Sequence, residues 1–224
     1  MTKKRKRNRV PGILFIVLFC ITLLGCSVVK LPFTVTKIAI QTTYLGGKTV
    51  YKTAQTVYKV GSFTFKVVKA PIDWALTHED IESIDGLPPR EAIAKGKVKC
   101  SPYVVRGKRY RPYCCKEARA YKEVGIASFY GYETLRKKGG HMTANGEVFD
   151  PHQLTAAHRL LPLPSYVKVT NLTNGKSIIV RVNDRGPFVE GRIIDLTIAG
   201  AKRLGFYRQG TTKVLVEALK VCAE

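Results

Sequence analysis

Residues that could carry out proton transfer gather in the C-terminal half of this 224-residue chain. Two carboxylates stand near turns, Glu147 after Gly146 and Asp184 before Gly186, and one imidazole, His158, lies between them in the sequence. One imidazole with two carboxylates outside helices is a suitable set for general acid–base catalysis. The polar stretches that hold them are 143–147, 157–158, 183–188 and 194–196.

Each of these three residues also has a structural explanation when it is taken alone. Asp184 could form an Asx turn, and Glu147 could pair with a basic residue at the surface. His158 could be a strand residue whose nitrogens are satisfied by its surroundings. A catalytic function therefore requires a fold that brings the three side chains together.

The surrounding sequence has the pattern of a small β-barrel. Short runs rich in β-branched and aromatic residues alternate with turn signals, and Asn174-Gly175 is typical of a β-hairpin. Thr197 can cap a helix that Gly205 can end. The expected strands are 124–130, 166–170, 177–182, 192–196 and 212–219. We predict one barrel over residues 123–220, which is long enough to bury its own core.

The first 26 residues have the parts of a secretory signal. Six of the first nine residues are basic, and an apolar run over 13–24 ends in Leu23-Leu24-Gly25-Cys26. This end resembles the lipobox of bacterial lipoproteins, in which residues 1–25 would be removed and Cys26 would receive lipid. In that family Ser27 usually permits passage to the outer membrane. An uncut signal anchor is the alternative, but the run is shorter than the ~18 to 20 residues that span a bilayer.

The formal net charge of +22 allows three interpretations: nucleic-acid binding, attraction to an anionic surface, or a basic targeting segment. Removing residues 1–25 removes six basic and no acidic residues, so the charge becomes +16. An exported protein leaves the compartment that holds the chromosome. We therefore expect anionic lipid or wall polymer, and no nucleic acid, as the partner.

Residues 26–95 form a membrane-proximal spacer with a seven-residue repeat. Its aromatic and apolar column predicts an amphipathic helix that lies on the membrane or forms a stalk, whereas the many Val and Thr residues favour strands. The helix is the preferred prediction. The column consists of Tyr44, Tyr51, Tyr58, Phe65 and Ile72. Residues 96–122 follow as a basic pre-barrel segment with interleaved tyrosines.

Four cysteines follow the expected lipid site: Cys100, Cys114, Cys115 and Cys222. An even number in an oxidising compartment predicts disulfides. A bond between the adjacent Cys114 and Cys115 is disfavoured by strain. Two schemes remain open, and each joins Cys100 to one of the adjacent pair and Cys222 to the other. A zinc site is the weaker alternative, because CxxC spacing and clustered histidines are lacking.

Residues 103–219 resemble the rare lipoprotein A (RlpA) family of bacterial lipoproteins. The stretches that carry the resemblance are 103–112, 125–131, 143–147, 154–158, 180–188 and 192–196. The resemblance implies a mainly β protein with a six-stranded double-psi β-barrel and one short helix. It also implies lytic transglycosylase activity on peptidoglycan, chiefly on glycan strands stripped of their stem peptides.

The family's functional residues correspond to Asp184, Glu147 and His158. The implied reaction cleaves the β-1,4 bond between N-acetylmuramic acid and N-acetylglucosamine, and the muramyl 6-hydroxyl closes a 1,6-anhydro ring. Asp184, with a raised pKa, would act as the single acid and base. Glu147 would assist, and His158 would orient the sugar or tune Asp184. We expect Arg185 to point elsewhere, because its charge would otherwise lower the pKa of Asp184.

The expected sugar-binding residues are Tyr130, Asn145, Asn183 and Arg185, and no metal or organic cofactor is required. The expected partners are glycan strands and, through the N-terminal lipid, a membrane; no protein partner is indicated. The expected location is the cell envelope, on the periplasmic side of the outer membrane.

Two features depart from the family's pattern. The chain stops at Glu224, after the last expected strand, without the C-terminal sporulation-related repeat domain that many members carry. Residues 131–142 also lack the usual Phe-His-Gly-Arg pattern. These departures leave a second hypothesis, a non-catalytic, expansin-like lipoprotein that binds peptidoglycan.

Overall fold

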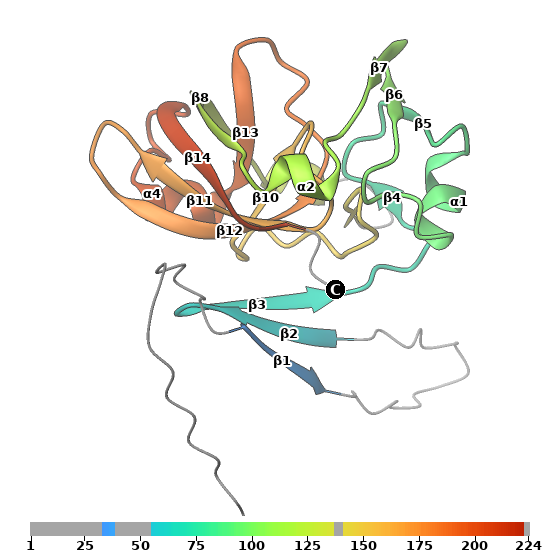
Figure 1. Cartoon of the computed structure of the whole chain (residues 1–224), viewed down its shortest axis with the longest axis horizontal. Helices are drawn as coiled ribbons and strands as arrows, with labels where there is room; N and C mark the ends of the chain where they lie inside the picture. Colours follow the sequence, from blue (N-terminus) through green and yellow to red (C-terminus); the bar gives the residue numbers. More distant parts are fainter. Residues whose placement is uncertain (1–32, 39–54, 137–140, 222–224) are drawn as a thin grey trace, which may run out of the picture. The chain divides into compact units, whose positions relative to one another are not determined.

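The computed structural model describes residues 33–38, 55–136 and 141–221, which are coloured in Figure 1. The expected signal segment and Cys26 lie outside the described residues. Among the residues that are described, none of the helices is both long and apolar enough to cross a membrane.

Six strands close into a barrel in the order β10-β12-β11-β14-β8-β13 (Figure 1). Two neighbouring pairs, β10–β12 and β8–β13, are parallel, and the other four pairs are antiparallel. The fold is the expected double-psi β-barrel. The strands are β8 (Lys122–Tyr130), β10 (Thr155–His158), β11 (Ser165–Asn171), β12 (Ser177–Asp184), β13 (Arg192–Thr197) and β14 (Thr212–Val221).

Five of the six barrel strands were expected from the sequence, and the sixth, β10, was not. Its residues are Thr-Ala-Ala-His, of which only Thr155 has the β-branched side chain that favours a strand. All four are buried, because β10 pairs with β12 on one side and with β13 on the other. Tertiary pairing thus forms a strand where local propensity is weak.

Helix α4 (Ile198–Leu204) begins and ends where the sequence predicts. The Thr197 hydroxyl accepts a hydrogen bond from the Gly200 N–H at 3.4 Å, and Gly205 adopts a left-handed φ of 77°. The described residues also contain three short helices that were not expected: α1 (Pro89–Ala94), α2 (Cys115–Ala118) and α3 (Tyr132–Leu135).

The amphipathic helix expected from the seven-residue repeat is wrong where the repeat is described, because residues 55–60 and 63–68 form strands. β2 (Gln55–Val60) and β3 (Phe63–Val68) make a hairpin, and β1 (Phe33–Ile38) pairs with β2. Tyr58 and Phe65 face each other directly across the hairpin. Two residues at equal distances from a turn can therefore reproduce a seven-residue spacing without any helix.

The segment before the barrel shares the barrel's hydrophobic core. Ile81, Tyr103 and Val105 belong to the same buried cluster as Val167 and Leu196 of the barrel. The strands here are β5 (Ile81–Ile84), β6 (Tyr103–Val105) and β7 (Lys108–Tyr110) in one small sheet, and β4 (Ala75–Leu76) with β9 (His141–Met142) in another. Residues 75–110 are thus an integral part of the folded unit.

The cysteines differ from both disulfide schemes. Cys100 and Cys114 are free thiols, whereas Cys115 is disulfide-bonded. Cys100 Sγ lies 3.9 Å from Cys115 Sγ, well beyond the roughly 2.05 Å of a bond. Neither of the two disulfides expected for Cys100 is therefore formed, and Cys222 lies outside the described residues.

The barrel core predicts a clear contrast between two leucines. Leu196 is fully buried in β13, whereas the Leu219 side chain on β14 is 40% exposed. Because Leu196→Ala leaves a cavity, it should lower the free energy of unfolding by about 2 to 5 kcal/mol. Leu219→Ala should change it by less than about 0.5 kcal/mol. Urea unfolding of both variants checks this, and equal losses would contradict the assigned core.

Candidate active site

The fold brings together the loops that carry Asp184 and Glu147. Asp184 ends β12, and the loop that holds Glu147 runs beside it. The Asn145 N–H donates to the Asn183 carbonyl at 3.1 Å, and the Ala144 N–H donates to Asp184 Oδ1 at 2.9 Å. The segments that carry two of the three expected catalytic residues are therefore neighbours, joined by hydrogen bonds from backbone N–H groups of the 143–147 loop.

Asp184 is completely buried, at 0% exposure. Its Oδ1 accepts from the N–H groups of Ala144 and Arg185, and its Oδ2 lies 3.4 Å from His78 Nε2. Burial raises the pKa of Asp184 above its ordinary value, and His78 and the two N–H groups only partly oppose this shift. The side chain is therefore suited to hold a proton, as a general acid must.

Glu147 is also buried, at 2% exposure, but it lies in a different electrostatic environment. Its two oxygens accept from Arg181 Nη2 at 2.8 Å and Nε at 3.2 Å, from Asn145 Nδ2 at 2.6 Å and from Asn183 Nδ2 at 2.9 Å. Burial alone would raise the pKa of Glu147, but the charge and hydrogen bonds of Arg181 and Asn183 hold it below its ordinary value. Glu147 is therefore a fixed anion, while Asp184 can change its charge.

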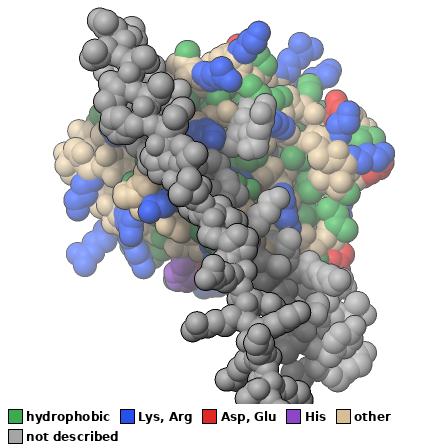
Figure 2. All heavy atoms as spheres, turned by 60° about the horizontal axis from the view of Figure 1, so that its bottom comes forward, with side chains coloured by type: hydrophobic (Ala, Val, Ile, Leu, Met, Phe, Trp, Pro, Cys, Tyr) green, Lys and Arg blue, Asp and Glu red, His purple; other side chains and the backbone are tan. Residues whose placement is uncertain are grey.

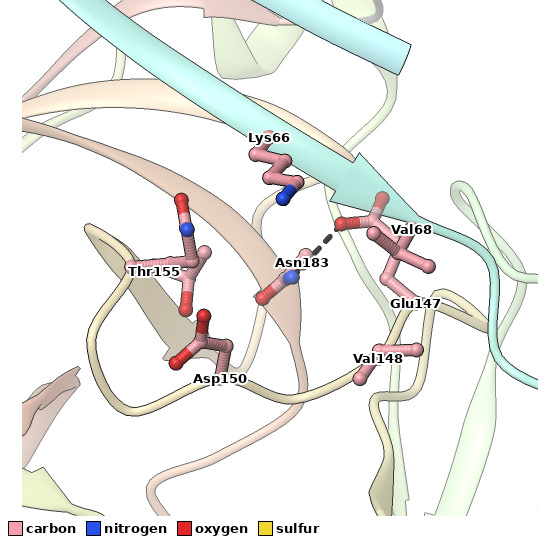
Figure 3. Close-up of a pocket in the computed structure, with 8 residues that line it drawn as sticks. Lys66, Val68, Glu147, Val148, Asp150, Thr155 and Asn183 are labelled. Atoms are coloured by element: carbon pink, nitrogen blue, oxygen red, sulfur yellow. Dashed lines mark hydrogen bonds between the residues drawn. The ribbon is translucent and has the colours of Figure 1, made fainter. Parts of the chain in front are cut away.

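Glu147 lines a small pocket of about 140 Å³ between β3 and the barrel. Figure 3 shows that the Glu147 carboxylate, the Lys66 ammonium group and the Asn183 amide gather in this pocket, with Asp150 and Thr155 on the opposite wall. The pocket therefore offers charged groups of both signs.

His158 is not joined to Asp184 by any contact among the described residues. Its Nδ1 accepts from the N–H groups of Leu160 at 3.1 Å and Leu161 at 3.0 Å, and its Nε2 lies 2.8 Å from the Tyr121 hydroxyl. Burial lowers its pKa to about 3, with smaller contributions from Arg185 and Arg159. A neutral imidazole with both nitrogens occupied stabilises the turn after β10, and this geometry does not support the expectation that it tunes Asp184 or orients the sugar.

Arg185 directs its guanidinium to backbone carbonyls, so it is not available to a ligand. Contrary to expectation, its charge still opposes the raised pKa of Asp184, although less strongly than His78 and the two backbone N–H groups do. Its guanidinium donates to the carbonyls of Leu161 at 2.5 Å and Val98 at 3.2 Å and lies 5.1 Å from the centre of the Tyr103 ring. Burial lowers its pKa to about 10. These contacts tie the barrel to the segment before it, so they favour a structural role over the expected sugar contact.

Tyr130, another of the expected sugar-binding residues, lies near the Asp184 carboxyl. Its pKa is raised mainly by burial and then by the charges of Asp184 and Asp195. Its ring stacks on Phe149 with 4.8 Å between centroids. Asn145 and Asn183 instead direct their amides to Glu147.

Two residues of the site had no role assigned from the sequence. Asp195, on β13, belongs to the polar stretch 194–196, and burial raises its pKa although Ser128, Arg192 and His78 oppose the shift. His78 lies before the barrel, where no motif indicated function. Among the described residues, no group of three or more His, Cys, Asp or Glu side chains could hold a metal ion.

Comparisons with known proteins agree with this picture. Residues 122–216 match the family described as "Lytic transglycolase". The chain is 57% identical over 124 residues to "Endolytic peptidoglycan transglycosylase RlpA" of Pseudomonas aeruginosa (strain UCBPP-PA14), covering 55% of this chain and 35% of that protein. The proteins of the same name from Vibrio cholerae and Rickettsia bellii are 48% and 44% identical, covering 66% and 67% of this chain and 53% and 64% of theirs.

The chain thus spans between about a third and two thirds of the length of these relatives. Among solved structures, a Streptomyces papain inhibitor matches 45% of this chain and 96% of its own, with a TM-score of 0.36 and 22% identity. An expansin of Clavibacter michiganensis matches 46% of this chain and 53% of its own, with a TM-score of 0.35 and 15% identity.

The ion pair between Glu147 and Arg181 predicts a specific loss of stability. Arg181→Met leaves the Glu147 carboxylate buried without its cation and should lower the free energy of unfolding by about 3 to 5 kcal/mol near pH 7. Because the pKa of Glu147 is lowered in the fold, the stability it contributes is present above the ordinary glutamate pKa. It is lost as the pH falls through the lowered value, so the difference from wild type should shrink in acid.

Urea unfolding between pH 3 and 8 measures this difference. The double variant Glu147→Gln/Arg181→Met should recover part of the loss, because it leaves no unpaired buried charge. Arg203→Met is the matched control, since Arg203 is exposed on α4. A loss that is the same at every pH would show that the lowered pKa of Glu147 is not its source.

Proposed function

The barrel of this chain belongs to the RlpA family, and on that premise we propose that the protein is a lytic transglycosylase acting on peptidoglycan glycan strands. The observation that carries the proposal is the pair of buried carboxyl groups whose pKa values are shifted in opposite directions. Such a division marks one group as the proton carrier and the other as a permanent charge.

Asp184 is the acid and base of the proposed reaction. The protonated carboxyl donates to the oxygen that links N-acetylmuramic acid to N-acetylglucosamine, and the bond from that oxygen to the muramyl C1 breaks. The resulting carboxylate then takes the proton of the muramyl 6-hydroxyl, whose oxygen bonds to C1 and closes the 1,6-anhydro ring. Asp184 ends as it began, so a second catalytic carboxyl is not required.

Glu147 has a positioning role in this mechanism. It holds the side chains of Asn145 and Asn183, and the backbone of Asn183 leads directly into Asp184. The anion thereby fixes the end of β12 from which Asp184 projects. His158 and Arg185 support the same end of the barrel through the contacts described above.

We place the glycan in a groove of about 520 Å³ that is lined in part by Phe188 and Tyr110. The Phe188 ring links this groove to the surroundings of Asp184. It lies 5.6 Å from the ring of Tyr110, which lines the groove, and 5.7 Å from the ring of His78, which faces Asp184. Aromatic faces can stack on sugar rings, and cations can bind the lactyl carboxylates of peptide-free muramyl residues. Other residues that line the groove are Arg106, Lys108, Arg159 and Glu190.

The surface charge agrees with an anionic polymer. Lys and Arg side chains project from much of the face in Figure 2, whereas Asp and Glu side chains are few on it. Long-range attraction of this kind raises the local concentration of a negatively charged strand.

A second candidate is glycan binding without cleavage. It is favoured by the complete burial of Asp184, which no ligand can reach without a local rearrangement. Digestion of peptide-free glycan strands distinguishes the two functions.

Digestion should release fragments with 1,6-anhydromuramyl ends, detected by mass spectrometry. Asp184→Asn should lower the rate by at least about a hundredfold, because it removes the proton carrier. Asp73→Asn, at an exposed carboxyl, is the matched control and should retain the wild-type rate. Wild-type protein that binds the strands but yields no anhydro ends would support the binding function instead.

We also propose that residues 1–25 are removed, that Cys26 carries the lipid and that the protein resides on the periplasmic side of the outer membrane. The lipobox-like sequence Leu23-Leu24-Gly25-Cys26 supports this. Cys26→Ala should shift the protein from the outer-membrane fraction to the soluble periplasmic fraction. Cys20→Ala, within the apolar run, should leave it in the membrane. Unchanged membrane association of Cys26→Ala would contradict the anchor.

A further inference from the structure

The side chain that faces Asp184 Oδ2 is His78, which comes from outside the barrel. His78 Nε2 lies 3.4 Å from Asp184 Oδ2, the oxygen that accepts no backbone N–H. Position 78 precedes the residues matched by the family, which begin at 122. The catalytic carboxyl therefore has a partner that the barrel alone does not supply.

The segment that carries His78 is bound to the loop of the active site by its backbone. The Ala70 N–H donates to the Gly146 carbonyl at 3.0 Å, and the Thr77 N–H donates to the Met142 carbonyl at 2.7 Å. Between them, β4 pairs in parallel with β9. The hydrogen bonds on both sides of β4 hold residues 70–77 in register with the loop, so the position of His78 is set by the fold.

The His78 imidazole is also held by the rings around it. Its centroid lies 5.7 Å from that of Phe188, with the two planes nearly perpendicular at 87°, and 6.0 Å from that of Tyr130. A Cβ at Gly186 would lie 3.4 Å from both Cε1 and Nε2 of His78, and Gly186 has a left-handed φ of 134°. The imidazole thus packs against the backbone that follows β12.

We propose that His78 is a positioning residue of the active site, which donates a hydrogen bond from Nε2 to Asp184 Oδ2 during the interval in which Asp184 is ionised. This inference rests on the proposed transglycosylase reaction. The carboxylate exists only between its two proton transfers, and a donor aimed at Oδ2 stabilises it then. Hydrogen bonds of this kind are often long before the substrate binds and shorten during the reaction, which suits the 3.4 Å separation.

The hydrogen bond from His78 should affect how the activity depends on pH, because it acts on the pKa of Asp184. The other ionisable groups near Asp184 are Tyr130 of β8, Tyr103 of β6 and Arg185, and Asp195 of β13 faces both Tyr130 and His78. A hydrogen bond or positive charge from His78 favours the ionised carboxyl, so it lowers the pKa of Asp184 against the effect of burial. Removing His78 should therefore raise that pKa further.

The test compares two variants of the full chain on peptide-free glycan strands. His78→Phe keeps a ring between Tyr130 and Phe188 but has no donor, whereas His78→Gln keeps an N–H at a similar reach. His78→Phe should lower kcat by about tenfold to a hundredfold, because the transient carboxylate loses a hydrogen bond. Activity declines as the pH rises through the pKa of Asp184, and in His78→Phe this decline should occur at higher pH. His78→Gln should restore most of the rate and the wild-type profile.

Three results would overturn the proposal. The first is a His78→Phe variant with the wild-type rate and pH profile. The second is a His78→Phe variant that is faster than wild type, which would mean that His78 covers the site. The third is a His78→Gln variant that is as slow as His78→Phe. His152→Phe, at an exposed histidine, is the matched control and should match wild type. The carbon-13 NMR titration of the Asp184 carboxyl separates this inference from the proposed function. Its pKa should rise in His78→Phe even if the wild type cleaves no glycan, and an unchanged value would also overturn the inference.

Discussion

The buried ion pair between Glu147 and Arg181 is the interaction on which the site depends. It joins the loop at residues 143–147 to β12 inside the protein, where neither charge could remain without the other. The remaining hydrogen-bonding capacity of the carboxylate is used by Asn145 and Asn183. The pair thereby aligns the two segments whose backbone groups hold Asp184.

The same burial gives Asp184 its chemistry. Arg181 compensates the desolvation of Glu147. For Asp184 the opposing effects of His78, two backbone N–H groups and the charge of Arg185 are outweighed by burial, so its neutral form is favoured. Because the raised pKa disfavours the charged form, Asp184 costs the fold some stability at neutral pH. An acid that must donate a proton near neutrality requires this environment, so part of the stability is given up for function.

The sequence predicted five of the six barrel strands and α4 because their signals are local: β-branched runs, a hairpin turn at Asn174-Gly175, and caps at Thr197 and Gly205. It did not predict β10, which forms through pairing with β12 and β13. It also indicated Asp184 and Glu147, which stand beside recognisable turns. It did not indicate the contacts of His78, which lies 106 positions before Asp184 and reaches it only through the pairing of β4 with β9. The roles of Arg181 and His158 were equally hidden, since burial and the direction of a side chain decide whether such a residue is a counter-ion, a catalyst or part of a turn.

The central claim is that one fold holds two buried carboxyl groups in opposite states, and the most direct test is to titrate both in the wild-type protein. Carbon-13 NMR of the side-chain carboxyl groups between pH 2 and 9, assigned with Asp184→Asn and Glu147→Gln, reports each group separately. We predict that Asp184 titrates above the ordinary aspartate value and Glu147 below the ordinary glutamate value. A Glu147 that binds its proton at higher pH than Asp184 does would contradict the account.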